Sequence, residues 1–214
     1  MSMPSERHAK FVEYLQSLSD SENRAALAAL RRGAGKPPGT APEMFPYIVP
    51  HTQGLSPHIA DLYYLIASLY ALHPVNTHNG NFGTSFRQLA LHRSQQEPTQ
   101  ESAQQKKTTE RSKKSQATGT PKLPESIERR FVALLRAHRD DLPVHLRHAV
   151  SLLASSPEPV PVNWAQLLED LSHWDHPDRF VQRQWADEFW GGSSSPAAED
   201  QAVPAAQDSG VADA

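Results

Sequence analysis

Apolar residues recur at helical spacing through the first half of the chain, and polar residues fill the positions between them. The first apolar stripe runs through residues 11–18, because positions three and four apart share one side of a helix. A second helix is expected to be capped by Asp20 or Ser21, whose short side chains can accept bonds from free backbone amides. Gly33 is expected to end it, since glycine is common just past a helix C-terminus.

Prolines mark the boundaries of the next segments. The short apolar segment 44–49 lies between prolines and predicts a single turn tucked against the core. The Ser-Pro pair at 56–57 is a typical helix start, because proline is tolerated in the first turn. Residues 59–72 are apolar on nearly every side, which predicts a central buried helix. A shorter helix is expected to open at 84–85.

The segment 128–139 separates its residues by face more cleanly than any other. At about 100° per residue, one side of the predicted helix carries Ile127, Phe131, Leu134, Leu135 and His138. The opposite side carries Arg129 and Arg136, flanked by Arg130 and Arg139. Arginine is always charged, and its planar fork matches phosphate oxygens. The face therefore predicts a stripe that binds a polyanion, with an ordinary solvated helix surface as the alternative.

Helical spacing continues to residue 190. Leu142 and Pro143 begin one helix, Asn163 with Gln166 resembles a capping box, and a last stripe runs through 181–189. Four helices joined by short loops are typical of an antiparallel bundle, and strand alternation is nowhere sustained. The sequence predicts an all-α fold of two helical lobes, the C-terminal lobe being an antiparallel helix bundle.

Composition divides the chain further. Hydrophobic residues make up 38% of it, below the usual range for a fully packed chain, so part of it is expected not to pack. Residues 94–121 lack large apolar side chains and are predicted to be a flexible linker. The acidic tail 191–214 is predicted to be disordered. An N-terminal helical domain is then expected at 1–93, and the C-terminal bundle at 122–190.

Several classes of protein are excluded or disfavoured. The chain has no cysteine, so disulfide frameworks and thiolate zinc sites are excluded. No apolar run approaches a membrane span of about 20 residues, and residues 1–10 are polar and charged, so a cytoplasmic protein without a membrane partner is expected. The sequence motifs of hydrolases, nucleotide-binding loops and dinucleotide folds are missing, which makes an enzyme a weak candidate.

Histidines and paired carboxylates raise the question of a metal. His145 and His148 are three residues apart, as are His173 and His176, but nothing in the sequence fixes a third ligand. Surface histidines, with His148 partly packed, are the better interpretation. The adjacent Asp140 and Asp141 could hold a cation, yet their place before a helix favours capping. We predict no catalytic, cofactor-binding or metal-binding residue.

Tryptophans could stack on nucleic-acid bases, but three of the four fall on or near apolar stripes. Trp164, Trp174 and Trp185 are therefore predicted to lie in the core. Trp190, at the end of the last helix, stays open.

Basic residues outside segment 128–139 complete the pattern. Arg24, Arg31 and Arg32 cluster in and after the second helix, although cations near a helix C-terminus also complement its dipole. Arg87 lies in the first turn of a predicted helix, where a cation is slightly unfavourable, which hints at a function. Arg147 flanks the helix after segment 128–139. Such groups on one surface would follow a phosphate backbone without reading bases.

The ordered set of segments resembles the CasB family, the small subunit of the type I-E CRISPR surveillance complex (Cascade). The resemblance spans most of 11–93 and 122–190, and it is carried by segments 24–32, 45–50, 83–90, 128–139, 141–150, 162–174 and 181–190. It implies an all-helical, two-lobed protein without catalytic activity. It also implies that two copies lie along the complex, contact the backbone and large subunits, steady the hybrid of guide RNA and target DNA, and hold the displaced DNA strand.

By this resemblance the nucleic-acid-binding residues would be Arg24, Arg31, Arg32, Arg87, Arg129, Arg130, Arg136, Arg139 and Arg147. Two other readings stay open. The arginines of a helical scaffold could pair with acidic surfaces of partner proteins. A nuclease that depends on a divalent cation would use Asp140 and Asp141.

Overall fold

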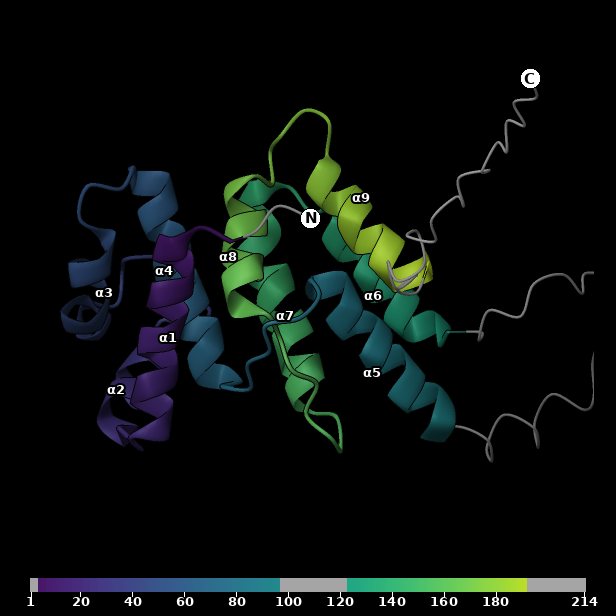
Figure 1. Cartoon of the computed structure of the whole chain (residues 1–214), viewed down its shortest axis with the longest axis horizontal. Coiled ribbons are helices and arrows are strands. Elements are labelled where there is room, and N and C mark those ends of the chain that lie inside the picture. Colours follow the sequence, from purple (N-terminus) through teal and green to yellow (C-terminus); the bar gives the residue numbers. More distant parts are fainter. Residues whose placement is uncertain (1–3, 97–122, 192–214) are drawn as a thin grey trace, which may run out of the picture.

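The computed structural model describes residues 4–96 and 123–191, and within these ranges the chain is helical without a strand (Figure 1). One isolated parallel bridge pairs Asn76 with Val162. The all-α prediction is confirmed for this part of the chain. The elements are α1 (Glu6–Asp20), α2 (Arg24–Arg31), η1 (Pro42–Met44), α3 (Phe45–Thr52), α4 (Pro57–Leu72), α5 (Phe82–Gln96), α6 (Glu125–Arg136), η4 (Arg139–Asp141), α7 (Leu142–Ala154), α8 (Trp164–Ser172), α9 (Phe180–Ala186) and a π-helical turn, η5 (Asp187–Gly191).

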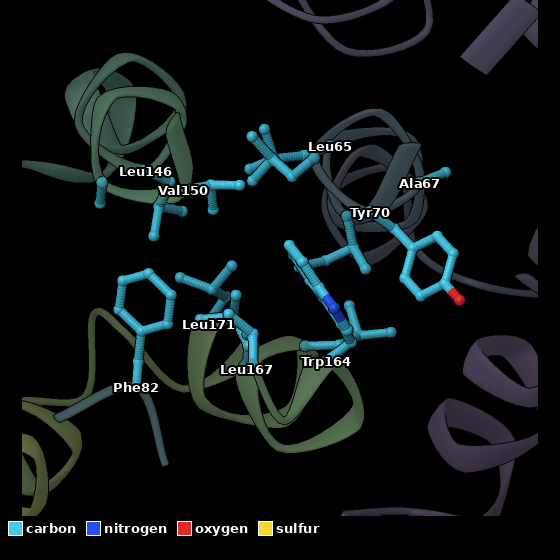
Figure 2. Packing of buried hydrophobic residues seen from close by; sticks show 14 of the residues in the cluster. Leu65, Ala67, Tyr70, Phe82, Leu146, Val150, Trp164, Leu167 and Leu171 are labelled. Carbon is cyan, nitrogen blue, oxygen red and sulfur yellow. The ribbon is translucent and has the colours of Figure 1, made fainter. Parts of the chain in front are cut away.

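Helix α4 is the centre of the fold, as its apolar sequence predicts. It packs against α2 and α3 on one side and against α7 and α8 on the other. Figure 2 shows how Tyr70 of α4, Val150 of α7 and Trp164 of α8 converge in the core. The rings of Tyr70 and Trp164 meet edge to face, with centroids 5.7 Å apart. No helix of the described ranges has both the length and the apolar character needed to cross a membrane.

Two extended segments bond the N-terminal half to the C-terminal half. The ring of His73 makes a 2.7 Å hydrogen bond with the carbonyl oxygen of Val160, and the amide of Val162 donates to the carbonyl of Val75. The indole of Trp164 donates to that same carbonyl of Val75 over 3.3 Å. Helix α5 also packs against α6, α7 and α9, so residues from both halves contribute to one hydrophobic core. The division into domains 1–93 and 122–190 stays a prediction.

A buried hydrogen bond between two side chains fastens α1 to α8. The imidazole of His8 lies 2.9 Å from a carboxylate oxygen of Glu169, and the amide of Ser5 donates to that oxygen over 2.9 Å. Burial lowers the pKa of His8, and the nearby carboxylate of Glu169 opposes this shift. The N-terminus of α1 is therefore held on α8 by two polar contacts as well as by apolar packing.

Several predicted helix boundaries were wrong. Asn23, not Asp20 or Ser21, caps α2, because its side-chain oxygen accepts from the amide of Ala26. The segment predicted as one turn is the two-turn helix α3, which contains Pro50. Helix α5 begins at Phe82, two residues before the predicted 84–85. The reason is that the side chain of the preceding Asn81 accepts from the first free amides.

Other predictions in the C-terminal half had mixed outcomes. The cap at Asn163 is confirmed, since its side-chain oxygen accepts from the amide of Gln166 over 3.1 Å. Asp141 precedes α7 without a capping bond from its side chain, so the capping function predicted for it was wrong. The three tryptophans predicted as core residues, Trp164, Trp174 and Trp185, are buried. The predicted linker beyond Gln96 and the tail beyond Gly191 lie outside the described residues.

Candidate nucleic-acid interface

Helix α6 separates its apolar and basic faces as predicted. Phe131 is buried and contacts Phe86 of α5 and Phe189 of η5, with ring centroids 5.1 and 4.3 Å apart. Ile127 and Leu134 are buried beside it. The opposite face is exposed and carries Arg129, Arg130 and Arg136. The core fixes the rotation of the helix, and so it fixes where these arginines point.

The helix ends three residues earlier than predicted. Ala137 adopts an extended backbone conformation after Arg136, so His138 and Arg139 leave the helical register. His138 is exposed and not part of the apolar face. Arg139 begins the short helix η4, and its guanidinium lies 2.9 Å from the carboxylate of Asp175. The predicted arginine stripe is therefore confined to the three arginines within α6.

A groove lies between α6 and the segment that leads into α9 and η5, and we call it the α6–α9 groove. It consists of two adjoining hollows of about 420 and 340 Å³ that share Arg136, Pro177, Arg179 and Gln182. The first hollow is also lined by Val132, Leu135, Asp178, Arg183, Ala186 and Trp190. Three arginines, Arg136 of α6, Arg179 just before α9 and Arg183 of α9, thus line one groove.

The local backbone explains why Arg179 reaches this groove. Arg179 has a left-handed backbone, with φ of 49°, at the turn into α9. Its guanidinium donates a 2.6 Å bond to the carbonyl oxygen of Leu135, in the last turn of α6. A cation at this position satisfies a free carbonyl and complements the helix dipole. Arg179 therefore stabilises the end of α6 and contributes positive charge to the groove.

Arg136 and Arg183 differ from Arg179 in having no partner. Both are exposed, and neither makes a hydrogen bond or ion pair with any residue that the structure describes. Two carboxylates line the groove, those of Asp175 and Asp178, and Asp175 is paired with Arg139. Arg136 and Arg183 are therefore free to bind an anion.

Trp190 also lines the groove. Its side chain is 37% exposed, and its indole N–H donates to a carboxylate oxygen of Glu128 over 3.0 Å. The ring also meets Phe189 and Phe131 edge to face. These contacts hold a partly exposed aromatic ring beside the arginines. A single nucleic-acid strand is recognised by this combination of cations for the backbone and a ring for a base.

Other predicted arginines have partners within the chain. The guanidinium of Arg31 donates to the carbonyl of Ala71 over 2.6 Å, which satisfies the C-terminal end of α4. Arg87 is half-buried and donates to the carbonyl of Phe189 over 3.0 Å. Arg129 forms an ion pair with Glu125 one turn earlier on the exposed face of α6. These contacts give Arg31 and Arg87 structural functions.

A second basic group lies away from α6. Arg24 and Arg32 are exposed on and after α2, 4.0 and 3.9 Å from the carboxylates of Glu22 and Glu43. Arg147 reaches from α7 to Gly35, where a β-carbon would lie 2.7 Å from its guanidinium. Helices α2 and α6 lie on opposite sides of α4, α7 and α8 (Figure 1). The nine predicted arginines are thus divided between separate surfaces.

Sequence reasoning missed Arg179 and Arg183, which lie in a stretch that is acidic overall. Their spacing of four residues places them on one side of the last helix and could have identified them. Among the described residues, no group of three or more histidines, aspartates or glutamates is placed to hold a metal ion.

Comparisons with known proteins agree with this fold. A family model described as "CRISPR-associated protein Cse2" matches residues 26–190. A CRISPR-associated protein Cse2 of Thermus thermophilus is 32% identical over 189 residues, 87% of this chain and 91% of the relative. The crystal structure of CasB from Thermus thermophilus superimposes with a TM-score of 0.64 and 28% identity, covering 86% of this chain and 98% of that one. A chain in a CRISPR RNA-guided surveillance complex shares the fold, with a TM-score of 0.60, 22% identity, and coverage of 86% and 91%.

Proposed function

The chain belongs to the Cse2 family of CRISPR-associated proteins, and on that premise we propose that it is the non-catalytic small subunit of a type I-E CRISPR surveillance complex (Cascade). In this function it contacts the backbone and large subunits and a second copy of itself. It binds guide RNA, target DNA and the displaced strand without sequence specificity, in antiviral defence. Base pairing reads the sequence in such complexes, and protein charge holds the opened strand. The cytoplasm is where this function is carried out.

The observation that supports nucleic-acid binding most directly is the α6–α9 groove. Arg136 and Arg183 line it from two elements and have no partner among the described residues, and Trp190 lines it beside them. Cations without carboxylate partners can release counterions from a phosphate backbone, which is the main source of non-specific affinity.

The test is a salt titration of single-stranded DNA binding by fluorescence anisotropy. Each phosphate contact contributes about 0.7 to the slope of log affinity against log salt for single strands. Arg136→Gln and Arg183→Gln should each weaken binding and reduce the slope by about that amount. Lys10→Gln is the matched control, because Lys10 is exposed on α1 and pairs with Glu6. An unchanged slope in the double variant Arg136→Gln/Arg183→Gln would show that the groove is not the contact surface.

A scaffold function is the second candidate, because the guanidinium groups of Arg136 and Arg183, which have no partner among the described residues, can pair with carboxylates of a partner subunit as well as with phosphates. In that case Arg136→Gln/Arg183→Gln lowers the yield of assembled complex and leaves the affinity for single-stranded DNA unaltered.

The non-catalytic assignment has a direct test. Labelled single-stranded DNA is incubated with the protein and Mg²⁺ or Mn²⁺, and it should remain intact. Cleavage that is lost in Asp140→Asn/Asp141→Asn would instead support a nuclease.

A further inference from the structure

A second, smaller hollow lies where α5, α6 and α7 meet. Its volume is about 110 Å³, and it is lined by Phe86, Arg130, Ala133, His145, His148, Ala149 and Leu152. None of these residues lines the α6–α9 groove. Sites for drug-sized ligands are usually larger, about 300 Å³ or more, so this hollow suits a single small group.

Three hydrogen-bond donors converge on this hollow from two helices. Arg130 comes from the exposed face of α6, and His145 and His148 are three residues apart on one side of α7. Residues three apart on a helix are neighbours, so both imidazoles can act on one ligand. Within the described ranges, none of the three side chains makes an ion pair or hydrogen bond. Their donor groups are free for a ligand.

The charge of the lining identifies an anion as that ligand. No carboxylate lines the hollow, and the permanent charge of Arg130 repels metal cations. A guanidinium can bind two oxygens of a phosphate at once, and the N–H of an imidazole ring adds a further donor. Phe86 from α5 and Leu152 from α7 provide apolar walls beside these donors.

We propose that Arg130, His145 and His148 form a phosphate-binding site, which holds one phosphate group of a nucleic-acid strand. This proposal rests on the proposed function and adds a specific contact on a different part of α6 from the groove. Of the elements packed against α7, α6 contributes Arg130 and α5 contributes Phe86 to the lining, whereas α4 and η4 contribute no lining residue.

The probe is dimethyl phosphate, a monoanionic model of the backbone diester. Binding to the full chain is followed by NMR of the histidine rings. The ring signals of His145 and His148 should shift together as the probe is added, with one dissociation constant for both.

Variants assign the effect to these residues. Arg130→Gln should abolish the shifts of both rings, and His145→Gln/His148→Gln should weaken binding of the probe measured by calorimetry. Arg129→Gln is the matched control, since it makes the same charge change on the same helix but its side chain pairs with Glu125 outside the hollow. Ring signals that do not respond to dimethyl phosphate, or an equal loss of the response in Arg129→Gln and Arg130→Gln, would overturn the proposal.

Two further probes separate the sources of the phosphate group. Single-stranded oligonucleotides with a 5′-phosphate or a 5′-hydroxyl should shift the rings equally if the site holds a backbone diester. A response to the 5′-phosphate alone would overturn the backbone assignment. The outcome is also separable from that of the proposed function. If the salt slope depends on Arg136 and Arg183 but the signals of the histidine rings do not respond, the proposal for the groove stands and only the phosphate site is refuted.

Discussion

The indole N–H of Trp185 on α9 donates a 2.6 Å hydrogen bond to a carboxylate oxygen of Asp170 on α8. The side-chain amide of Gln166 donates to the other oxygen over 2.8 Å. Both Trp185 and Asp170 are buried, so this bond fixes α9, and with it Arg183 of the groove, to the centre of the fold. Burial raises the pKa of the Asp170 carboxyl from 3.8 to about 6, and the two hydrogen bonds oppose the shift.

This raised pKa predicts a pH-dependent contribution to stability. Between pH 3.8 and about 6 the folded state holds a proton on Asp170 that the unfolded state has released. The stability that this bound proton contributes to the folded state is therefore fully present below pH 3.8, and it is lost as the pH rises to about 6. Two pKa units correspond to roughly 3 kcal/mol. Asp170→Asn, which cannot ionise, should flatten this part of the curve of unfolding free energy against pH, measured by urea titration.

The buried His8 titrates with the opposite sign and must be separated from Asp170. Because burial lowers its pKa, the stability associated with His8 rises with pH up to its ordinary value of 6.5. His8→Asn is therefore the control, and it should flatten the rising component only. If Asp170→Asn leaves the pH profile of the wild-type protein unchanged, the carboxyl does not titrate in the predicted window.

Local periodicity predicted most of the helices because each one buries an apolar face. The arginine face of α6 followed from the same rule, since the buried position of Phe131 determines where Arg129 and Arg136 point. Caps were harder to predict. Asp20, Ser21 and Asn23 can all cap a helix, and the left-handed turn at Glu22 that selects Asn23 has no sequence signal as clear as a glycine.

The groove itself could not be predicted from local sequence. Leu135 and Arg179 are 44 residues apart in the chain, and tertiary packing brings α9 beside α6. The bond from Arg179 to Leu135 lies at the last turn of α6, and the helix ends there at Arg136, before the residue 139 that its amphipathic pattern predicts. The functions of Arg31 and Arg87 depend on backbone carbonyls that are 40 and 102 residues away, so their sequence positions did not reveal them.

Gly83 should tolerate no side chain. A β-carbon there would lie 2.1 Å from the carbonyl oxygen of Trp185, because the start of α5 touches the backbone of α9. Gly83→Ala must displace one of the two helices, at a cost of about 1–3 kcal/mol. Thermal unfolding measures the effect. Gly191→Ala is the matched control, since nothing lies within 4 Å of its β-carbon position; equal melting temperatures for the two variants would contradict the close approach.

Arg87 should act through stability and not through binding. Its bond to the carbonyl of Phe189 joins α5 to η5, and a charged donor to a backbone oxygen contributes about 1.5–3 kcal/mol. Arg87→Gln should therefore lower the free energy of unfolding by an amount in about that range. For this variant, the slope of log affinity against log salt for single-stranded DNA should equal that of the wild-type protein. A reduced slope with unchanged stability would restore Arg87 to the nucleic-acid interface.

Trp190 should contribute to single-strand binding in a way that salt does not alter. Stacking of a base on an exposed ring is worth about 1–3 kcal/mol and involves no counterion release. Trp190→Ala should then weaken binding of single-stranded DNA by about tenfold. The slope that Arg136 and Arg183 produce should remain, and Trp190→Phe should keep most of the affinity because it keeps a ring.

Two controls make this last prediction specific to stacking. Trp190 also packs on Phe131 and Phe189, so unfolding curves must show that Trp190→Ala is folded at the assay temperature. Val144→Ala removes another exposed apolar side chain, on α7, that lines neither hollow of the groove, and should leave affinity unchanged. A similar loss in both variants, or a salt slope that falls with Trp190→Ala, would mean that the indole supports the arginines and does not itself contact a base.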